Sequence, residues 1–137
     1  MKRILIIDDD ASVRETFLAA LADRNYALET ADSGAAGLES ARCRRPDLVF
    51  LDLKMPEMSG VEALARLHAI SPDVPVYIFT GFYRSFLEPL KDLQKRGITF
   101  DLARKPLTLA EIRAIADGVL KHSIDTAPPY RPTRGSR

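Results

Sequence analysis

The sequence contains one cysteine, almost no net charge and no long apolar run. Because Cys43 has no second cysteine to pair with, an intramolecular disulfide is excluded, which is typical of proteins from a reducing compartment. The 20 Lys and Arg against 19 Asp and Glu create no overall field that would favour nucleic acid. No apolar run reaches the ~18 residues of a membrane span, and the first residues lack a secretory signal pattern. We therefore expect a soluble cytoplasmic chain with neither a membrane nor a nucleic-acid partner.

Short apolar runs alternate with amphipathic segments along most of the chain. Three compact runs predict strands that are covered on both faces: Ile4–Ile7, Leu48–Leu51 and Val76–Phe79. Two weaker, more alternating runs, Tyr26–Thr30 and Ile98–Leu102, suit edge strands. Five β-then-α units over residues 1–121 predict an α/β domain, with a doubly wound, five-stranded parallel sheet between two helical layers.

Capping patterns indicate where the helices begin. Three Ser/Thr-x-x-Glu pairs predict capping boxes: Ser12 with Glu15, Ser59 with Glu62, and Thr108 with Glu111. The fourth helix is open to two interpretations, with Ser85 as its cap or Pro89 as its first residue, and Gly97 ends it in both. Cys43 is expected to be a small packing residue.

Residues 122–137 differ in composition from the rest. This segment, HSIDTAPPYRPTRGSR, has three prolines, little apolar content and a net charge of +2 from three Arg and one Asp. Such a composition is typical of a flexible tail or a truncated linker.

Polar residues follow the predicted strands at the ends where ligands bind in parallel sheets. They are Asp8, Asp9 and Asp10 after the first strand, Asp52 after the third, Thr80-Gly81 after the fourth and Lys105-Pro106 after the fifth. Carboxylates that share one cleft cannot all stay ionised unless cations offset them. Lys105 provides one positive charge, and a few oxygen ligands with room for water favour Mg²⁺ over a calcium site.

These motifs together resemble a response regulator receiver domain of two-component signalling. The resemblance covers residues 1–121 and includes Leu51-Asp52-Leu53-Lys54-Met55-Pro56-Glu57-Met58-Ser59-Gly60. It implies the flavodoxin-like (βα)5 fold with strand order 2-1-3-4-5. It further implies that Asp52 accepts a phosphoryl group from a sensor histidine kinase or a phosphotransfer protein. The domain would catalyse its own phosphorylation and its own slow dephosphorylation, and would not be a conventional enzyme.

The same resemblance assigns the remaining site residues. One Mg²⁺ would be held by Asp9, Asp52 and the backbone carbonyl of Lys54, with Asp8 acting through water. Thr80, Gly81 and Lys105 would bind the phosphoryl group and form the switch, and the bond between Lys105 and Pro106 would be cis. Asp10 is expected to cap the first helix instead of binding metal. Lys54 and Phe82 would flank the path of the hydrolytic water and favour a long-lived phosphoform.

Two positions depart from the commonest family pattern. Gly81 stands where alanine is usual, and Leu102 replaces the aromatic switch residue. Aromatic residues instead lie at Phe82, Tyr83 and Phe86, which together with Leu102 form a candidate output surface; these aromatics either contact a partner or fold back onto the core. No effector sequence follows, so the signal is expected to pass to a separate protein, unless the chain is a fragment of a larger regulator. The chain itself is expected to be a monomer or a dimer that forms on phosphorylation.

Other classes of protein share parts of this pattern. Asp8-x-Asp10 after an apolar strand resembles a haloacid-dehalogenase phosphatase with Asp8 as the nucleophile, although Ser12 stands where that motif has Thr or Val. A receiver-like binding module that works without phosphorylation is the other alternative. Taken singly, an Asp at the end of a strand is usually a turn or cap residue. Neither His68 nor His122 has a partner at metal or catalytic spacing.

Overall fold

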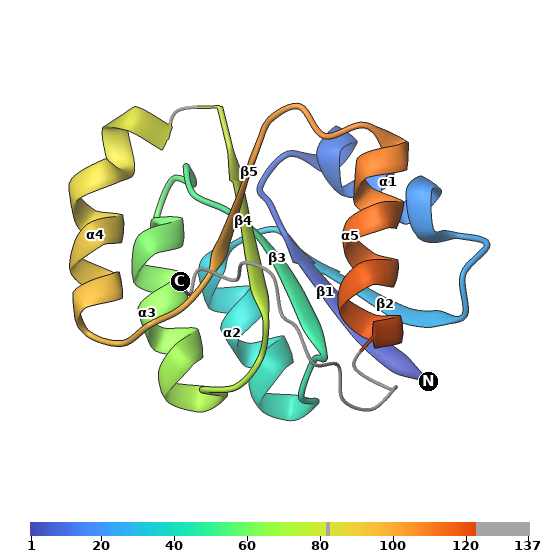
Figure 1. Ribbon diagram of the computed structural model, residues 1–137, viewed down its shortest axis with the longest axis horizontal. Helices are drawn as coiled ribbons and strands as arrows, with labels where there is room; N and C mark the ends of the chain where they lie inside the picture. Colours follow the sequence, from blue (N-terminus) through green and yellow to red (C-terminus); the bar gives the residue numbers. More distant parts are fainter. Residues whose placement is uncertain (82, 123–137) are drawn as a thin grey trace.

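The structure is a computed structural model that describes residues 1–81 and 83–122 (Figure 1). Within these residues, five strands alternate with helices. The strands are β1 (Lys2–Ile7), β2 (Tyr26–Ala31), β3 (Leu48–Asp52), β4 (Val76–Thr80) and β5 (Asp101–Arg104). The helices are α1 (Ala11–Leu21), α2 (Gly34–Cys43), α3 (Gly60–Ile70), the 3₁₀ helix η1 (Tyr83–Phe86), α4 (Leu87–Lys95) and α5 (Leu109–His122). None of the helices in this part of the chain combines the length and apolar character needed to cross a membrane.

The five strands form one parallel sheet in the order β2-β1-β3-β4-β5, which confirms the predicted fold. β2 and β5 lie at the two edges, as their weaker apolar patterns predict. Because all strands run in one direction, their carboxyl ends meet at one rim, the upper one in Figure 1. The register pairs Asp52 with Phe79 and Thr80 with Arg104, so the ends of β3, β4 and β5 lie nearly level.

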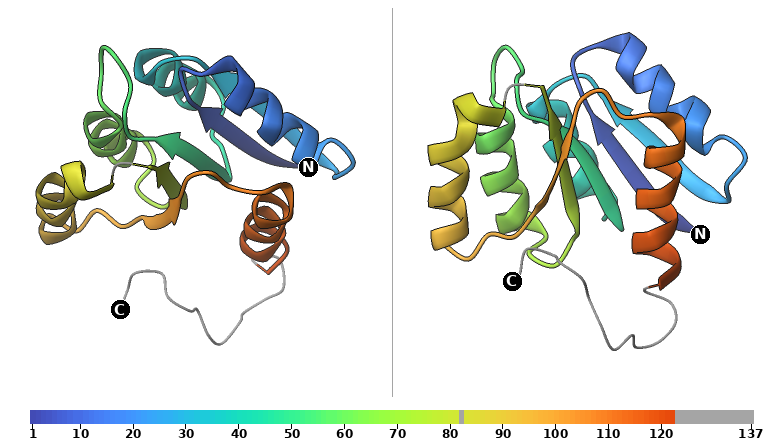
Figure 2. Two further views of the ribbon diagram at one scale, coloured as in Figure 1. Left: turned by 90° about the horizontal axis from the view of Figure 1, so that it is seen from above. Right: turned by 45° about the horizontal axis from the view of Figure 1, so that its top comes forward.

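Side chains of the central strands alternate between two apolar cores. In β1, Leu5 and Ile7 pack into a core with α2, α3 and α4, whereas Ile4 and Ile6 pack into a second core with α1 and α5. Figures 1 and 2 show the corresponding layers, with α1 and α5 on one side of the sheet. Phe17 belongs to the second core, and its ring centroid lies 4.8 Å from that of Phe50. Both faces of the sheet are therefore covered, as the near-continuous apolar runs predict.

Two of the three capping boxes begin where they were predicted. Ser59 accepts a hydrogen bond from the backbone N–H of Glu62, and Thr108 and Glu111 exchange hydrogen bonds in both directions. The prediction that Ser12 caps α1 is wrong. Asp10 is the N-cap and accepts from the backbone N–H of Ser12 at 2.9 Å, as expected for an acid at this place.

Helix α4 begins differently from both interpretations of its sequence. Its N-cap is Phe86, which makes no capping hydrogen bond through its side chain, and Pro89 is its third residue. A proline fits there because the first backbone N–H groups of a helix have no partner within the helix. Gly97 ends α4 as predicted, with φ of 85° and a hydrogen bond from the N–H of Ile98 to the carbonyl of Leu93.

Strand β5 begins three residues later than predicted and ends two residues later. Ile98 and Phe100 are buried in the core that contains α4. Both residues lie in the connection that precedes the strand and not in the strand itself. Their apolar character therefore reflects packing of a loop against the core. Cys43 is exposed at the end of α2, so the prediction that it packs inside is wrong.

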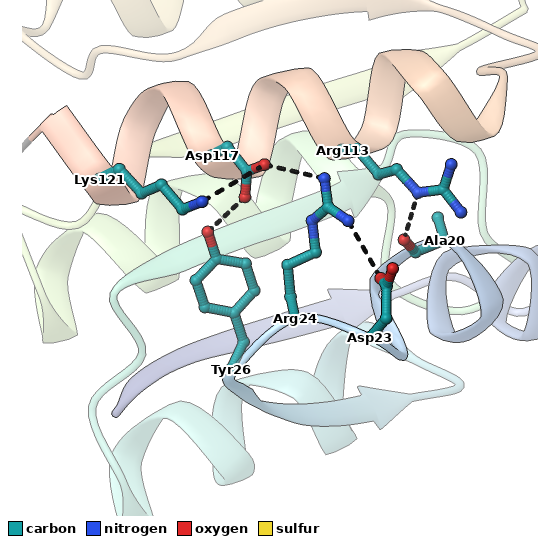
Figure 3. A network of polar contacts seen from close by, with 7 residues as sticks. All are labelled: Ala20, Asp23, Arg24, Tyr26, Arg113, Asp117 and Lys121. Carbon is teal, nitrogen blue, oxygen red and sulfur yellow. Dashed lines mark hydrogen bonds and ion pairs between the residues drawn. The ribbon is translucent and has the colours of Figure 1, made fainter.

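Polar contacts tie α5 to β2 and the loop that follows α1 (Figure 3). We call these contacts, centred on Asp117, the Asp117 network. Asp117 accepts a hydrogen bond from Tyr26 Oη at 2.6 Å and pairs with Arg24 at 3.0 Å and with Lys121 at 3.9 Å. Arg113 also donates to the carbonyl of Ala20 at 2.8 Å. These contacts add directional restraint to the apolar packing between α1 and α5.

Candidate functional site

Three aspartates meet at the carboxyl ends of β1 and β3. One carboxylate oxygen from each of Asp8, Asp9 and Asp52 lies within 4.8 Å of the other two. Asp8 and Asp52 are buried, with 0% and 2% of their surface exposed, whereas Asp9 is exposed. We call these three residues the acid cluster. It has two interior carboxylates and one that faces solvent.

The short connection from β1 to α1 holds Asp8 through its backbone and side chain. Its N–H donates to the carbonyl of Ala31 at 3.1 Å, and its Oδ1 accepts from the N–H of Asp10 at 2.9 Å. Its Oδ2 is buried and accepts no hydrogen bond. Arg14 donates from Nη1 to the carbonyl of Asp8 at 2.8 Å, a contact that the sequence analysis missed. The turn therefore leaves one oxygen of Asp8 available for an electrostatic partner.

Gly60 allows the start of α3 to approach the end of β3. A Cβ at this position would lie 2.3 Å from the carbonyl oxygen of Asp52 and 2.5 Å from Cα of Leu53. The N–H of Gly60 donates to the carbonyl of Leu53 at 2.8 Å. Only glycine fits this approach without displacing the backbone next to Asp52. Close backbone packing therefore explains why the motif ends in a glycine at position 60.

Lys105 places a positive charge between the two buried carboxylates. Its Nζ lies 3.2 Å from Oδ1 of Asp52 and 3.4 Å from Oδ2 of Asp8. It also lies 5.2 Å from the centroid of the Phe79 ring, which the sequence analysis did not include among the site residues. The Lys105 N–H donates to the carbonyl of Thr80 at 3.1 Å, and the following bond to Pro106 is cis. The β5–α5 connection thereby aims the ammonium at the acid cluster.

Burial dominates the protonation equilibria of the site. Desolvation, together with the neighbouring charge of Asp8, raises the pKa of Asp52 to about 6. Desolvation likewise raises the pKa of Asp8, although the Asp10 N–H and Lys105 oppose this rise. Burial by itself disfavours the ammonium of Lys105, but the charges of Asp52 and Asp8 raise its pKa overall. Lys105 is therefore cationic at neutral pH, and the carboxylates lack enough compensating charge.

The acid cluster has the chemistry of a magnesium site. Its three carboxylates and one ammonium would leave two negative charges when all are ionised, which one divalent cation would neutralise. The buried Oδ2 of Asp8 has only the ammonium of Lys105 beside it, at 3.4 Å and without a hydrogen bond among the described residues, and the exposed Asp9 leaves one side open to water. Few oxygen ligands with access to water suit Mg²⁺. The donor set therefore fits the metal expected from the sequence.

The structure brings the other rim residues to the same place. Thr80 is buried, with 1% exposed, at the end of β4. A Cβ at Gly81 would lie 3.9 Å from Cβ of Lys105, an ordinary contact, so no steric need explains this glycine. Lys54 is exposed, and its backbone N–H donates a hydrogen bond to the carboxylate of Asp52. Phe82, the second residue assigned to water access, lies outside the described residues.

Of the four residues predicted to form the output surface, one is exposed, one packs on the core and two have side chains outside the described residues. Leu102 is 46% exposed on β5, as expected for a contact residue. Phe86 is half-buried and packs against the core that contains α4, so this aromatic folds back. Tyr83 begins η1, but its side chain and the whole of Phe82 lie outside the described part of the chain. Exposed Leu87 and Leu109 were not predicted, since single apolar residues at helix starts carry no sequence signal.

The phosphatase alternative does not fit this geometry. A nucleophilic Asp8 would need a free carboxylate oxygen, yet its Oδ1 accepts from the N–H of Asp10 and its Oδ2 lies beside Lys105. The second acid of that motif, Asp10, is occupied as the cap of α1, where it accepts from both the N–H and the hydroxyl of Ser12. The arrangement instead leaves Asp9 and Asp52 to act with Lys105.

Comparisons with known proteins give a consistent result. The response regulator receiver domain profile matches residues 4–117. The chain is 32% identical over 130 residues to the response regulator MprA of Mycobacterium sp. strain KMS, covering 95% of this chain and 55% of that protein. It is 35% identical over 128 residues to the transcriptional regulatory protein ZraR of Escherichia coli K12, covering 92% of this chain and 28% of ZraR. The chain thus spans about half of MprA and less of ZraR.

Two solved structures resemble this fold over nearly their full length. The Vibrio cholerae chemotaxis protein CheY4 matches with a TM-score of 0.75 and 26% identity, over 88% of this chain and 99% of CheY4. A CheY-like receiver domain protein from Methanospirillum hungatei matches with a TM-score of 0.77 and 26% identity, over 90% of this chain and 97% of that protein. With the fold, the rim and the sequence match in agreement, the chain belongs to the response regulator receiver domain family.

Proposed function

We propose that Asp52 accepts a phosphoryl group and that this modification signals to a separate protein. The observation that carries the proposal is the buried Asp52 carboxylate, paired with Lys105 at 3.2 Å inside a cluster of three acids. A structural ion pair would need only one carboxylate for one ammonium. The surplus negative charge, held in a fixed arrangement at the rim, is better explained by a charged ligand and its metal.

In the proposed reaction, a carboxylate oxygen of Asp52 attacks the phosphorus of a phosphohistidine on a sensor histidine kinase or phosphotransfer protein. The new O–P bond forms as the P–N bond breaks, and the electron pair of that bond stays on the imidazole nitrogen. Lys105 lies close enough to Asp52 to offset charge on the phosphoryl oxygens. Mg²⁺, held by Asp9, Asp52 and the Lys54 carbonyl with Asp8 acting through water, would add two positive charges. The chemistry that this metal would supply is neutralisation of charge on the phosphoryl oxygens.

The same proposal gives roles to the remaining rim residues. The Thr80 hydroxyl would donate to the attached phosphoryl group, and its neighbour Gly81 leaves the approach open because it has no side chain. The resulting shift would reach the α4–β5–α5 face, where Leu102 is exposed. There it would alter binding to a partner or a second copy of the chain. These partners and their kinase belong in the cytoplasm.

A binding module that works without phosphorylation is the alternative proposal. It is favoured by Leu102, which stands where the family commonly has the aromatic switch residue and which lies exposed on β5. In that case the output face would be equally competent before and after phosphorylation. Binding of a partner to wild type and to Asp52→Asn with equal affinity, with and without phosphodonor, would support this alternative.

Intact-mass spectrometry after incubation with Mg²⁺ and acetyl phosphate tests the main proposal. Wild type should gain one phosphoryl group, whereas Asp52→Asn should gain none. Asp117→Asn is the matched control, because Asp117 is also an ion-paired aspartate but is only partly buried and belongs to the Asp117 network (Figure 3). It should be labelled like wild type. Equal labelling of Asp52→Asn and wild type would remove Asp52 from its role, and chelation of the metal should abolish labelling.

A further inference from the structure

Arg14 occupies a place in α1 where the helix dipole by itself disfavours a cation. It lies in the first turn of α1, and that turn contains no acidic residue. The positive end of a helix dipole favours acids there and disfavours Arg. Side chains on a helix lean toward its N-terminus, so Arg14 reaches back over the turn that carries the acid cluster. Its Nη1 donates to the carbonyl oxygen of Asp8 at 2.8 Å, and the side chain is half-buried.

This contact completes the restraints on the β1–α1 turn. The N–H of Asp8 is held by the carbonyl of Ala31, its Oδ1 by the N–H of Asp10, and its carbonyl by Arg14. Asp10 is itself fixed as the cap of α1, and its carbonyl accepts from the N–H of Arg14 at 3.1 Å. With the peptide units on both sides of Asp8 held, this acid is oriented before any cation arrives. Such preorganisation reduces the cost of bringing like charges together on binding.

We propose that Arg14 is a positioning residue for the acid cluster and sets its affinity for Mg²⁺. The inference rests on the proposed function, because it assigns a residue to the metal site of that function. Arg14 touches neither the metal nor the phosphoryl group in this account. It acts by fixing the peptide unit between Asp8 and Asp9 through its contact to the Asp8 carbonyl.

Arg113 provides a matched control for a purely structural role. It makes the same kind of contact, from Nε to the carbonyl of Ala20 at 2.8 Å, and it is also half-buried (Figure 3). Ala20 lies near the carboxyl end of α1, far along the helix from the acid cluster. Arg14→Met and Arg113→Met each remove one guanidinium and one contact to a backbone carbonyl. Arg14→Leu provides a second variant if Arg14→Met does not fold.

Two measurements decide the inference. Titration of Mg²⁺, followed by the rise in melting temperature, should give an affinity about tenfold weaker in Arg14→Met than in wild type, within the range for residues that orient metal ligands. Arg113→Met should match wild type. Without metal, amide exchange by NMR should show lost protection of the Asp10 N–H in Arg14→Met, and wild-type protection in Arg113→Met.

The result that would overturn the inference is wild-type Mg²⁺ affinity together with wild-type protection of the Asp10 N–H in the Arg14 variants. Equal changes in the Arg14 and Arg113 variants would also overturn it, because they would reveal a general loss of stability. If wild type itself shows no Mg²⁺ effect, the proposed metal site fails. The amide exchange of Asp10 then decides the positioning role alone.

Discussion

Replacing Asp52 with asparagine should stabilise the protein at neutral pH in the absence of metal. In the folded protein the pKa of Asp52 is raised from 3.8 to about 6, chiefly by desolvation. Ionising it at neutral pH therefore opposes folding. At about 1.4 kcal/mol for each unit of pKa, the difference amounts to about 3 kcal/mol. Asparagine carries no charge, but it also gives up the pairing with Lys105, so we expect a net gain of about 1–3 kcal/mol.

The contribution of Asp52 to the free energy of unfolding should depend on pH in a defined direction. Because the folded pKa lies above the unfolded one, the folded state holds its proton where the unfolded state has lost it. The contribution of Asp52 to stability is thus most favourable below 3.8 and declines as pH rises toward about 6. The advantage of Asp52→Asn should therefore be full at about pH 7.5 and mostly absent at about pH 4.

Urea unfolding in the presence of a chelator measures the effect. At about pH 7.5 the expected gain in free energy of unfolding corresponds to a melting temperature roughly 4–12 °C higher for a domain of this size. A loss of stability in Asp52→Asn at neutral pH, or a difference that does not change between the two pH values, would contradict a destabilising charge on Asp52.

Asp117→Asn serves as the opposite control for the same experiment. Although partial burial favours its neutral form, hydrogen bonds from Tyr26 and Arg24 lower the pKa of Asp117 overall. Its ionised form therefore stabilises the fold above its unfolded pKa, and this contribution disappears as pH falls through the folded pKa. Asp117→Asn should lose stability at neutral pH, and the loss should shrink in acid.

Further predictions follow from the same contacts. Mg²⁺ up to roughly tens of millimolar should raise the melting temperature of wild type and not of Asp9→Ala, since the ion binds only the folded acid cluster; an unchanged wild-type curve argues against the site. Gly60→Ala should lose about 1–3 kcal/mol because its Cβ meets the backbone of Asp52, whereas Gly81→Ala should gain about 0.4–1 kcal/mol by restricting the unfolded chain. Chemical denaturation compares the two, and equal effects contradict the packing argument. Lys54→Asn and Phe82→Glu should speed decay of the phosphoprotein in a time course, whereas unchanged decay means that neither side chain limits access of water.

The sequence predicts the sheet well because burial on both faces leaves a simple pattern. Ile4–Ile7 and Leu48–Leu51 are apolar at every position, and the structure buries all of them. Ile98 and Phe100 are equally buried but belong to a loop. An apolar residue reports burial and not backbone conformation, so the start of β5 was placed too early. The start of α4 was missed because Phe86 caps it without a side-chain hydrogen bond.

The site could be predicted where residue type and strand position together determine the contact. Parallel strands bring Asp8, Asp52 and Lys105 to one rim, and the structure places Lys105 within 3.4 Å of both acids. The role of Asp10 as a cap also follows from its position. Arg14 and Asp117 could not be found in this way. Their partners, a backbone carbonyl and a tyrosine 91 residues away, depend on tertiary packing that no local pattern contains.

The most direct test of the central claim is to locate the phosphoryl group on the chain. The protein is phosphorylated with acetyl phosphate and Mg²⁺, treated with borohydride to reduce the acyl phosphate to an alcohol, and mapped by peptide mass spectrometry. The account predicts reduction of the side chain at Asp52 and at no other aspartate. Modification at Asp8 or Asp9 with Asp52 unchanged, or on a histidine, would contradict it.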